Sequence, residues 1–256
     1  MPFTLAHPAA AVPLARPLGR HGVLSALVIG SLVPDFWYLI PPAGRNASHS
    51  VAGLLWYVLP VGLLCYCVFH AALKRPLIAL FAPVLAARLA GSSAAGLPRV
   101  PWSAVVVSLL AGGATHLAWD AFTHWRGSAV QAMPALQTLL ASFGAVDVRV
   151  YHVLQAASSI LGLALLAHWC VRWLREAPPV AAPEPQAAPG RPYLAVCLLL
   201  ALAVVTVAVG CVQIARALEP GASALAGALA RSLLGAGVVG VLAYGAAWHL
   251  REARRR

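Results

Sequence analysis

Three ionisable side chains recur at four-residue intervals in one apolar stretch of this sequence. His116, Asp120 and His124 lie toward the end of a hydrophobic run that begins near Trp102 and holds no other ionisable side chain. On a helix, positions i, i+4 and i+8 share one face. Burying three such groups is costly in free energy unless each has a partner. The row therefore indicates a site that binds something.

The helical spacing of this row restricts what it can bind. Imidazole and carboxylate groups are suitable ligands for zinc and related divalent metals. Each four-residue step rises about 6 Å, so His116 and His124 stand about 12 Å apart and cannot share one ion. Asp120 can bridge two ions, or His116 and Asp120 can hold one ion with His124 supporting them. A structural polar network and a path for protons or ions are the alternatives.

The chain around this row has the composition of a membrane protein. Hydrophobic residues make up 61% of its 256 positions and charged residues only 10%, and the mean hydropathy is +0.81. Soluble domains carry about 25% charged residues. We therefore expect an all-α fold, a polytopic helical bundle in the lipid bilayer. The net charge of +11 is spread between apolar runs and the C-terminus, which favours lipid headgroups over nucleic acid as a partner.

Apolar segments predict five to six transmembrane helices, because most reach the roughly 20 residues that a bilayer requires. The first is interrupted by Pro34-Asp35 and is expected to be re-entrant. A Pro-rich linker, residues 176–192, separates the unit of residues 1–175 from a C-terminal helix pair with a basic tail, residues 193–256. The distribution of Lys and Arg places the C-terminus in the cytoplasm. The segments are residues 22–40, 51–72, 102–124, 151–174, 193–215 and 225–250.

This topology gathers further candidate ligands beside the row. The end of the first segment and the starts of the second and fourth lie on the same membrane side as the end of the third. These ends carry Asp35, His49 and His152. The residues alone therefore predict a metal site drawn from Asp35, His49, His116, Asp120, His124 and His152.

Four stretches of the first 175 residues together form a specific pattern. They are MPFTLAHPAA, LSALVIGSLVPDFWYLI, SHSVAGLLWYVLPVGLLCYCVFH and GGATHLAWDAFTH. The pattern resembles an uncharacterised family of bacterial multi-pass membrane proteins that is described only as a domain of unknown function. The resemblance covers residues 1–175 and leaves the C-terminal pair outside. It implies a multi-pass protein of the bacterial cytoplasmic (inner) membrane.

The order of ligand-type residues is also similar, more distantly, to zinc-dependent phospholipase C and to membrane-bound metal-dependent hydrolases of bacteria. The zinc enzymes use an early His, an Asp followed by a His, a His-x-x-x-Asp helix and further His residues. The glutamate that follows their last His is Ala156 here, so the resemblance implies one or two ions. The matching positions are His7, Asp35 with His49, His116 with Asp120, His124 and His152.

The resemblance implies a hydrolase of phosphoesters or other esters in which a divalent metal, zinc, activates the attacking water. Asp35 is expected to be a ligand or the general base, and Asp120 the bridging carboxylate. A site at bilayer depth favours a lipid-like substrate. The alternatives are a non-enzymatic membrane protein with a structural metal or a buried polar network, and a transporter that relays ions.

Overall fold

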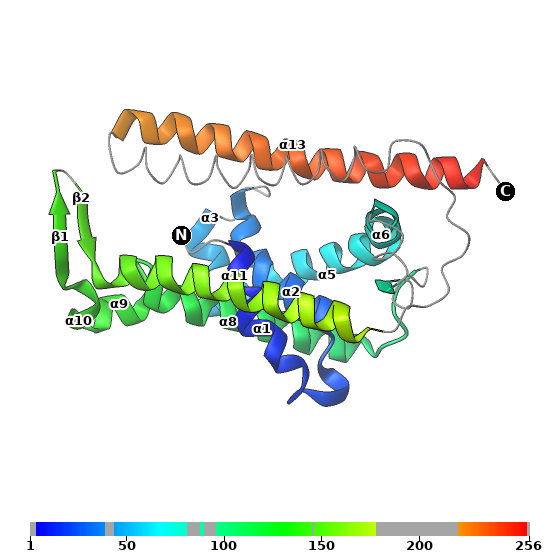
Figure 1. Cartoon of the computed structure of the whole chain (residues 1–256), viewed down its shortest axis with the longest axis horizontal. Coiled ribbons are helices and arrows are strands. Elements are labelled where there is room, and N and C mark those ends of the chain that lie inside the picture. The colour runs from blue at the N-terminus through cyan, green and yellow to red at the C-terminus, as the bar shows by residue number, and fades with distance from the viewer. Residues whose placement is uncertain are drawn as a thin grey trace. The chain divides into compact units, whose positions relative to one another are not determined.

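The computed structural model describes residues 4–38, 44–80, 88–89, 96–144, 146–177 and 220–254. Within these ranges the chain is mostly helical, and its strands form one two-stranded hairpin (Figure 1). The chain divides into two compact units. The first comprises Met1–Tyr66 and Arg99–Arg172, and the second comprises Cys67–Pro98 and Trp173–Arg256.

The first unit begins with short helical turns that lead into one short apolar helix, α2. Pro8 opens α1, where its missing N–H is not needed. The helix α2 ends at Leu32, because Pro34 cannot donate the next helical hydrogen bond. The chain continues as a tighter 3-10 turn that carries Asp35. The bounds are η1 Thr4–Ala6, α1 Pro8–Ala11, η2 Val12–Ala15, η3 Gly19–His21, α2 Leu24–Leu32, η4 Val33–Tyr38 and α3 Gly44–Ser48.

A long helix, Val51–Leu80, follows and passes from the first unit into the second. The Ser50 hydroxyl caps its start by accepting a hydrogen bond from the N–H of Gly53 at 2.9 Å. Two wider π-helical turns interrupt its α-helical geometry. Its segments are α4 Val51–Gly53, η5 Leu54–Val58, α5 Leu59–Val68, η6 Phe69–Leu73 and α6 Lys74–Leu80.

The remaining elements begin with α8, whose 22 residues carry His116 and Asp120; the helix ends at Thr123, so His124, expected on the same helical face, follows directly in extended backbone. Two short helices and an antiparallel hairpin stand between α8 and the next long helix, α11 (Figure 1). The second unit includes α13, at the end of the described chain. The bounds are α8 Trp102–Thr123, α9 Ser128–Ala132, α10 Pro134–Gln137, β1 Leu139–Phe143, β2 Val146–Arg149, α11 Val150–Glu176 and α13 Pro220–Ala253.

Three helices of the described chain are long and apolar enough to cross a membrane. They are Val51–Leu80, Trp102–Ala132 and Val150–Glu176. The apolar helix Leu24–Trp37 is shorter, about 21 Å at 1.5 Å per residue, against a hydrocarbon core of about 30 Å. The structure thus accounts for three of the five to six expected helices. Residues 193–215 and most of the Pro-rich stretch lie outside the described residues, and residues 225–250 lie within α13.

Two glycines bring the backbones of α2 and α8 into direct contact. A Cβ atom on Gly30 would lie 2.2 Å from the carbonyl oxygen of Leu109, and one on Gly112 would lie 2.2 Å from that of Leu27. Only residues without a side chain permit this approach. As a result, the end of α2 and the turn that carries Asp35 lie against the face of α8 that carries the ionisable row.

Candidate metal centre

Side chains from separate segments of the first unit meet around Asp120. Most of them are buried: the relative exposures are 1% for His7, 5% for Asp35, 0% for His116 and 5% for Asp120. Such burial requires that each group has a compensating partner. The contributing positions are His7 between η1 and α1, Asp35 on η4, His49 after α3, His116 and Asp120 on α8, and His124 at its end.

One group of three ligand atoms has the spacing of a tetrahedral metal site. Nε2 of His49 lies 3.3 Å from Oδ1 of Asp35 and 3.3 Å from Nε2 of His116. Nε2 of His116 lies 3.7 Å from the same Asp35 oxygen. Zinc bonds of about 2.0–2.2 Å at tetrahedral angles separate the ligand atoms by about 3.3–3.6 Å. These three atoms therefore suit three corners of a tetrahedron.

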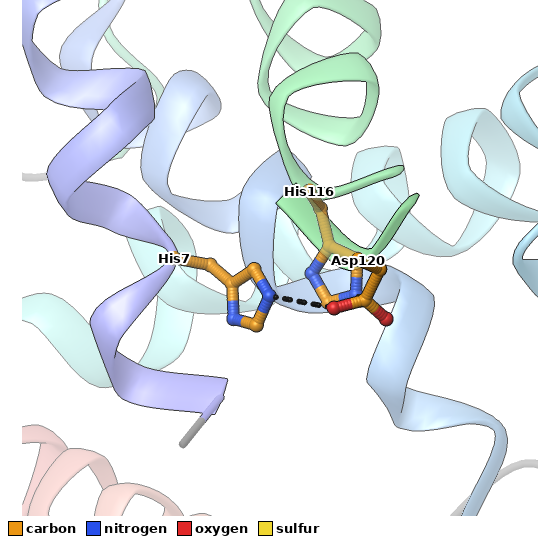
Figure 2. Close-up of side chains that lie close together, drawn as sticks. All are labelled: His7, His116 and Asp120. Atoms are coloured by element: carbon orange, nitrogen blue, oxygen red, sulfur yellow. Dashed lines mark hydrogen bonds and ion pairs between the residues drawn. The ribbon is translucent and has the colours of Figure 1, made fainter. Parts of the chain in front are cut away.

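A second group shares His116 and adds His7 and Asp120. Nε2 of His7 lies 3.2 Å from Oδ1 of Asp120 (Figure 2). The ring of His7 stacks on that of His116, with centroids 3.9 Å apart. Nε2 of His116 lies 3.6 Å from Oδ2 of Asp120. In each group the ligand atoms all lie within 4.8 Å of one another. One nitrogen binds one ion, so His116 can serve only one of the two groups.

Backbone carbonyl groups orient three of the imidazole rings. In each of these rings Nδ1 lies within hydrogen-bond distance of a carbonyl oxygen, to which it can donate, and Nε2 faces the centre. This arrangement is typical of metal-binding histidines. The pairs are His7 with Thr4 at 3.2 Å, His49 with Arg45 at 3.2 Å and His116 with Ser31 at 2.8 Å.

The two oxygens of the Asp35 carboxylate have different surroundings. The hydroxyl of Thr4 donates a hydrogen bond of 2.6 Å to Oδ2. Buried Oδ1 faces Nε2 of His49 at 3.3 Å and Nε2 of His116 at 3.7 Å. A carboxylate oxygen beside two imidazole nitrogens at these distances is a suitable donor set for a divalent metal, so the residues present fit such an ion. Buried Nε2 of His124 has no hydrogen-bond partner among the residues that the structure describes.

The two oxygens of Asp120 face different partners. Oδ1 lies 3.2 Å from Nε2 of His7 and 3.2 Å from Nδ1 of His124. Oδ2 lies 3.3 Å from the Arg45 guanidinium and 3.4 Å from Nε2 of His49. A carboxylate with imidazoles on both sides can bridge two ions. Asp120 is therefore the central group of the cluster.

His49, which lies outside the membrane-crossing helices, has a raised pKa. Burial lowers the pKa of this imidazole, but its contacts with the Asp120 and Asp35 carboxylates raise it more strongly. A proton on His49 thus favours its contacts with the two carboxylates in the metal-free cluster. A metal ion bound by His49 would replace this proton, because a ligating imidazole nitrogen must be deprotonated.

The comparisons with known proteins place the chain in a family. The family model described as a domain of unknown function (DUF4184) matches residues 1–246. The chain belongs to the DUF4184 family. The match extends beyond residue 175, where the resemblance was expected to end, and takes in most of the C-terminal region of this DUF4184 chain. Comparison with curated proteins and with solved structures gave no match, so the similarity to zinc-dependent hydrolases stays a prediction.

The cluster of the DUF4184 chain includes most of the predicted ligands. Asp35, His49, His116 and Asp120 converge within a few ångströms. His7, which only the distant resemblance suggested, contacts Oδ1 of Asp120, and His124 contacts the same oxygen. The recorded contacts of His152 are local, with its Nδ1 accepting from the N–H of Arg149 at 3.1 Å and its ring close to Tyr151. The role of His152 as a metal ligand stays a prediction.

Sequence reasoning missed two side chains that contact the candidate ligands, Thr4 and Arg45. Thr4 holds Asp35, and Arg45 contacts Asp120. Their spacing offered a weak signal, because Thr4 precedes His7 by three residues and Arg45 precedes His49 by four. One helical turn places such positions on a common side.

Proposed function

We propose that this chain is an integral membrane protein that hydrolyses phosphoesters or other esters with the help of a divalent metal, zinc. The observation that supports this best is the spacing of Asp35, His49 and His116. Catalytic zinc sites use three protein ligands and leave a further position for water or substrate, and these three residues offer such a set.

The proposed centre holds one or two ions. Asp35, His49 and His116 would hold the first, since all three distances among their ligand atoms suit one ion. His7 and Asp120 would hold a second, with Asp120 as the bridging carboxylate. A divalent metal at this centre supplies Lewis acidity and a nucleophilic water at neutral pH.

The protein's own residues supply position and proton transfer. Asp35 acts as a ligand or as the general base, with its second oxygen held by Thr4. His124 stabilises the Asp120 carboxylate from the side away from Arg45. The burial of this cluster limits access of bulk water to the reacting centre.

The surroundings of the centre suit a lipid-like substrate. The helix that bears His116 and Asp120 is one of the three apolar enough to cross a membrane. The neighbouring helix α11 contacts the chain next to His7, where a Cβ atom on Gly162 would lie 3.2 Å from that of Ala6. That helix also exposes large apolar side chains, among them Ile160 at 71%, as expected for a surface in lipid.

The proposal includes a topology. It retains five to six membrane crossings in the bacterial cytoplasmic membrane, counting the apolar sequence segments 193–215 and 225–250, with the C-terminus in the cytoplasm. The segment 22–40 is re-entrant, which leaves His7 on the same side as the other ligands. Attachment of a reporter enzyme to the C-terminus tests the orientation.

A buried polar network without metal is the second candidate, because Asp120 already contacts imidazoles and a guanidinium at 3.2–3.6 Å. Metal analysis of detergent-purified protein separates the two. We expect stoichiometric zinc, manganese or iron in the wild type, its loss in His116→Ala and Asp120→Ala, and retention in Asp147→Ala, which alters an exposed carboxylate on β2. Hydrolysis of generic phosphodiester and ester substrates should be measurable in the wild type and in Asp147→Ala and should be lost in His116→Ala and Asp120→Ala. Absence of metal from the wild type refutes the proposal.

A further inference from the structure

Arg45 is a cationic side chain that contacts the candidate centre and has no place in its ligand set. Its Nη2 donates to Oδ2 of Asp120 at 3.3 Å. The side chain is 25% exposed, whereas that of Asp120 is 8% exposed. Arg45 therefore extends from the solvent-accessible edge of the cluster to its central carboxylate.

The contact between Arg45 and Asp120 competes with metal binding. The same oxygen, Oδ2, lies 3.4 Å from Nε2 of His49 and 3.6 Å from Nε2 of His116, so it is available to the ion that these imidazoles bind. A dication there would repel a guanidinium and take up the charge of the carboxylate. Metal binding would therefore release the Arg45 guanidinium from Asp120.

The released guanidinium stays beside the centre because its backbone is anchored there. The Arg45 carbonyl oxygen lies 3.2 Å from Nδ1 of His49 and accepts a hydrogen bond of 3.1 Å from the Ser48 hydroxyl. Metal binding by His49 preserves these contacts, since they involve Nδ1 and not Nε2. The side chain alone has to move.

Charge and shape indicate what the released group binds. When the imidazoles are neutral, as metal binding requires of the ligating ones, two carboxylates and one guanidinium have a net negative charge, which one divalent ion makes positive. A guanidinium has planar, forked donors that match the oxygens of a phosphoryl group. We propose that Arg45 binds the anionic phosphoryl oxygens of the substrate at the metal centre. This inference rests on the proposed function and narrows it to phosphoesters, because a neutral ester offers no such charge.

Phosphate binding to the zinc-loaded full chain in phosphatidylcholine nanodiscs tests the inference. Isothermal titration with inorganic phosphate and with glycerol phosphate compares the wild type, Arg45→Ala, Arg45→Lys and the control Arg126→Ala. Arg126 is an exposed arginine two residues after His124, so the control removes the same charge close to the centre. We expect Arg45→Ala to raise the Kd for phosphate about tenfold or more, Arg45→Lys to raise it less, and Arg126→Ala to leave it within about twofold. An unchanged Kd in Arg45→Ala, or an equal change in Arg126→Ala, overturns the inference.

Two further readouts identify the source of the phosphoryl group and separate this inference from the proposed function. Phosphatidic acid added to the nanodiscs competes with phosphate in the wild type if the ligand is a lipid headgroup, and does not compete if it is a soluble phosphoester.

Zinc titration without phosphate should show binding in Arg45→Ala that is about threefold tighter than in the wild type, because a competing cation is gone. Weaker zinc binding in this variant contradicts the release of Arg45. If zinc binds normally and only the phosphate effect is missing, the inference fails and the proposed function stands.

Discussion

Replacement of Asp120 by Asn removes the charge at the middle of the cluster while keeping the size of the side chain. Asp120 contacts His7 and His124 through one oxygen and His49, His116 and Arg45 through the other. An amide offers one acceptor oxygen and places two donors against the other partners. The substitution therefore removes both the bridge and the charge that stabilises bound cations.

The size of the effect can be worked out from the ligand set. Structural zinc contributes about 10–16 kcal/mol over four ligands, or about 3 kcal/mol for each, so loss of one ligand weakens binding about 100-fold or more. At a zinc concentration 100 times the wild-type Kd, binding stabilises the wild type by about 2.7 kcal/mol and the variant by only about 0.4 kcal/mol. In a chain of this size, zinc should therefore raise the Tm of the wild type by about 5–10 °C and that of the variant by about 1 °C.

Thermal unfolding in detergent, with and without zinc, measures this difference. The matched control is Asp147→Asn on β2, an exposed carboxylate that contacts Ser142 and Arg149 and should keep the wild-type shift. A zinc-induced shift in Asp120→Asn equal to that of the wild type would refute the central role of this carboxylate. A smaller shift in Asp147→Asn would show that general electrostatics, and not the cluster, determines the response.

Three further predictions concern the support of the centre. Thr4→Val, which removes the hydrogen bond to Asp35, should weaken zinc binding about 10–100-fold, whereas Thr4→Ser should bind as the wild type does. Gly30→Ala forces apart the backbones of α2 and α8 and should lower the free energy of unfolding by about 1–3 kcal/mol or more; Gly237→Ala, with open space around its Cβ position, should be neutral or stabilising. The pKa of His49 in the folded protein is raised above its ordinary value of 6.5. The contribution of the His49 side chain to the free energy of unfolding of the metal-free protein is therefore full below pH 6.5 and is lost as the pH rises through the folded-state pKa. Zinc affinity should rise over the same pH range. In His49→Gln, both the stability measured by thermal unfolding and the affinity measured by zinc titration should depend less on pH.

The sequence alone located the centre of the cluster because helical spacing is a local property. His116, Asp120 and His124 had to share one face of any helix formed from that segment. The interruption at Pro34-Asp35 likewise predicted that the first apolar segment differs from a full crossing, and α2 does end there. Such features depend on a few neighbouring residues, so they could be derived without the fold.

Contacts between distant segments could not be derived in this way. The hydrogen bond from Thr4 to Asp35 and the contact of Arg45 with Asp120 depend on how α1 packs on α8 and how α3 packs on η4. The close approach of α2 and α8 at Gly30 and Gly112 holds η4, which follows α2, beside α8. The sequence contains many glycines that could permit close backbone contact, and only the tertiary structure distinguishes those at which two backbones touch.

X-ray absorption spectroscopy of the zinc-loaded full chain, combined with metal quantification, shows whether these side chains form a metal centre. We expect one or two zinc ions per chain, nitrogen and oxygen ligands at about 2.0–2.2 Å, and a clear imidazole signal that falls in His116→Ala. Absence of stoichiometric zinc, or sulfur ligands at about 2.3 Å, would contradict a centre built from Asp35, His49, His116 and Asp120.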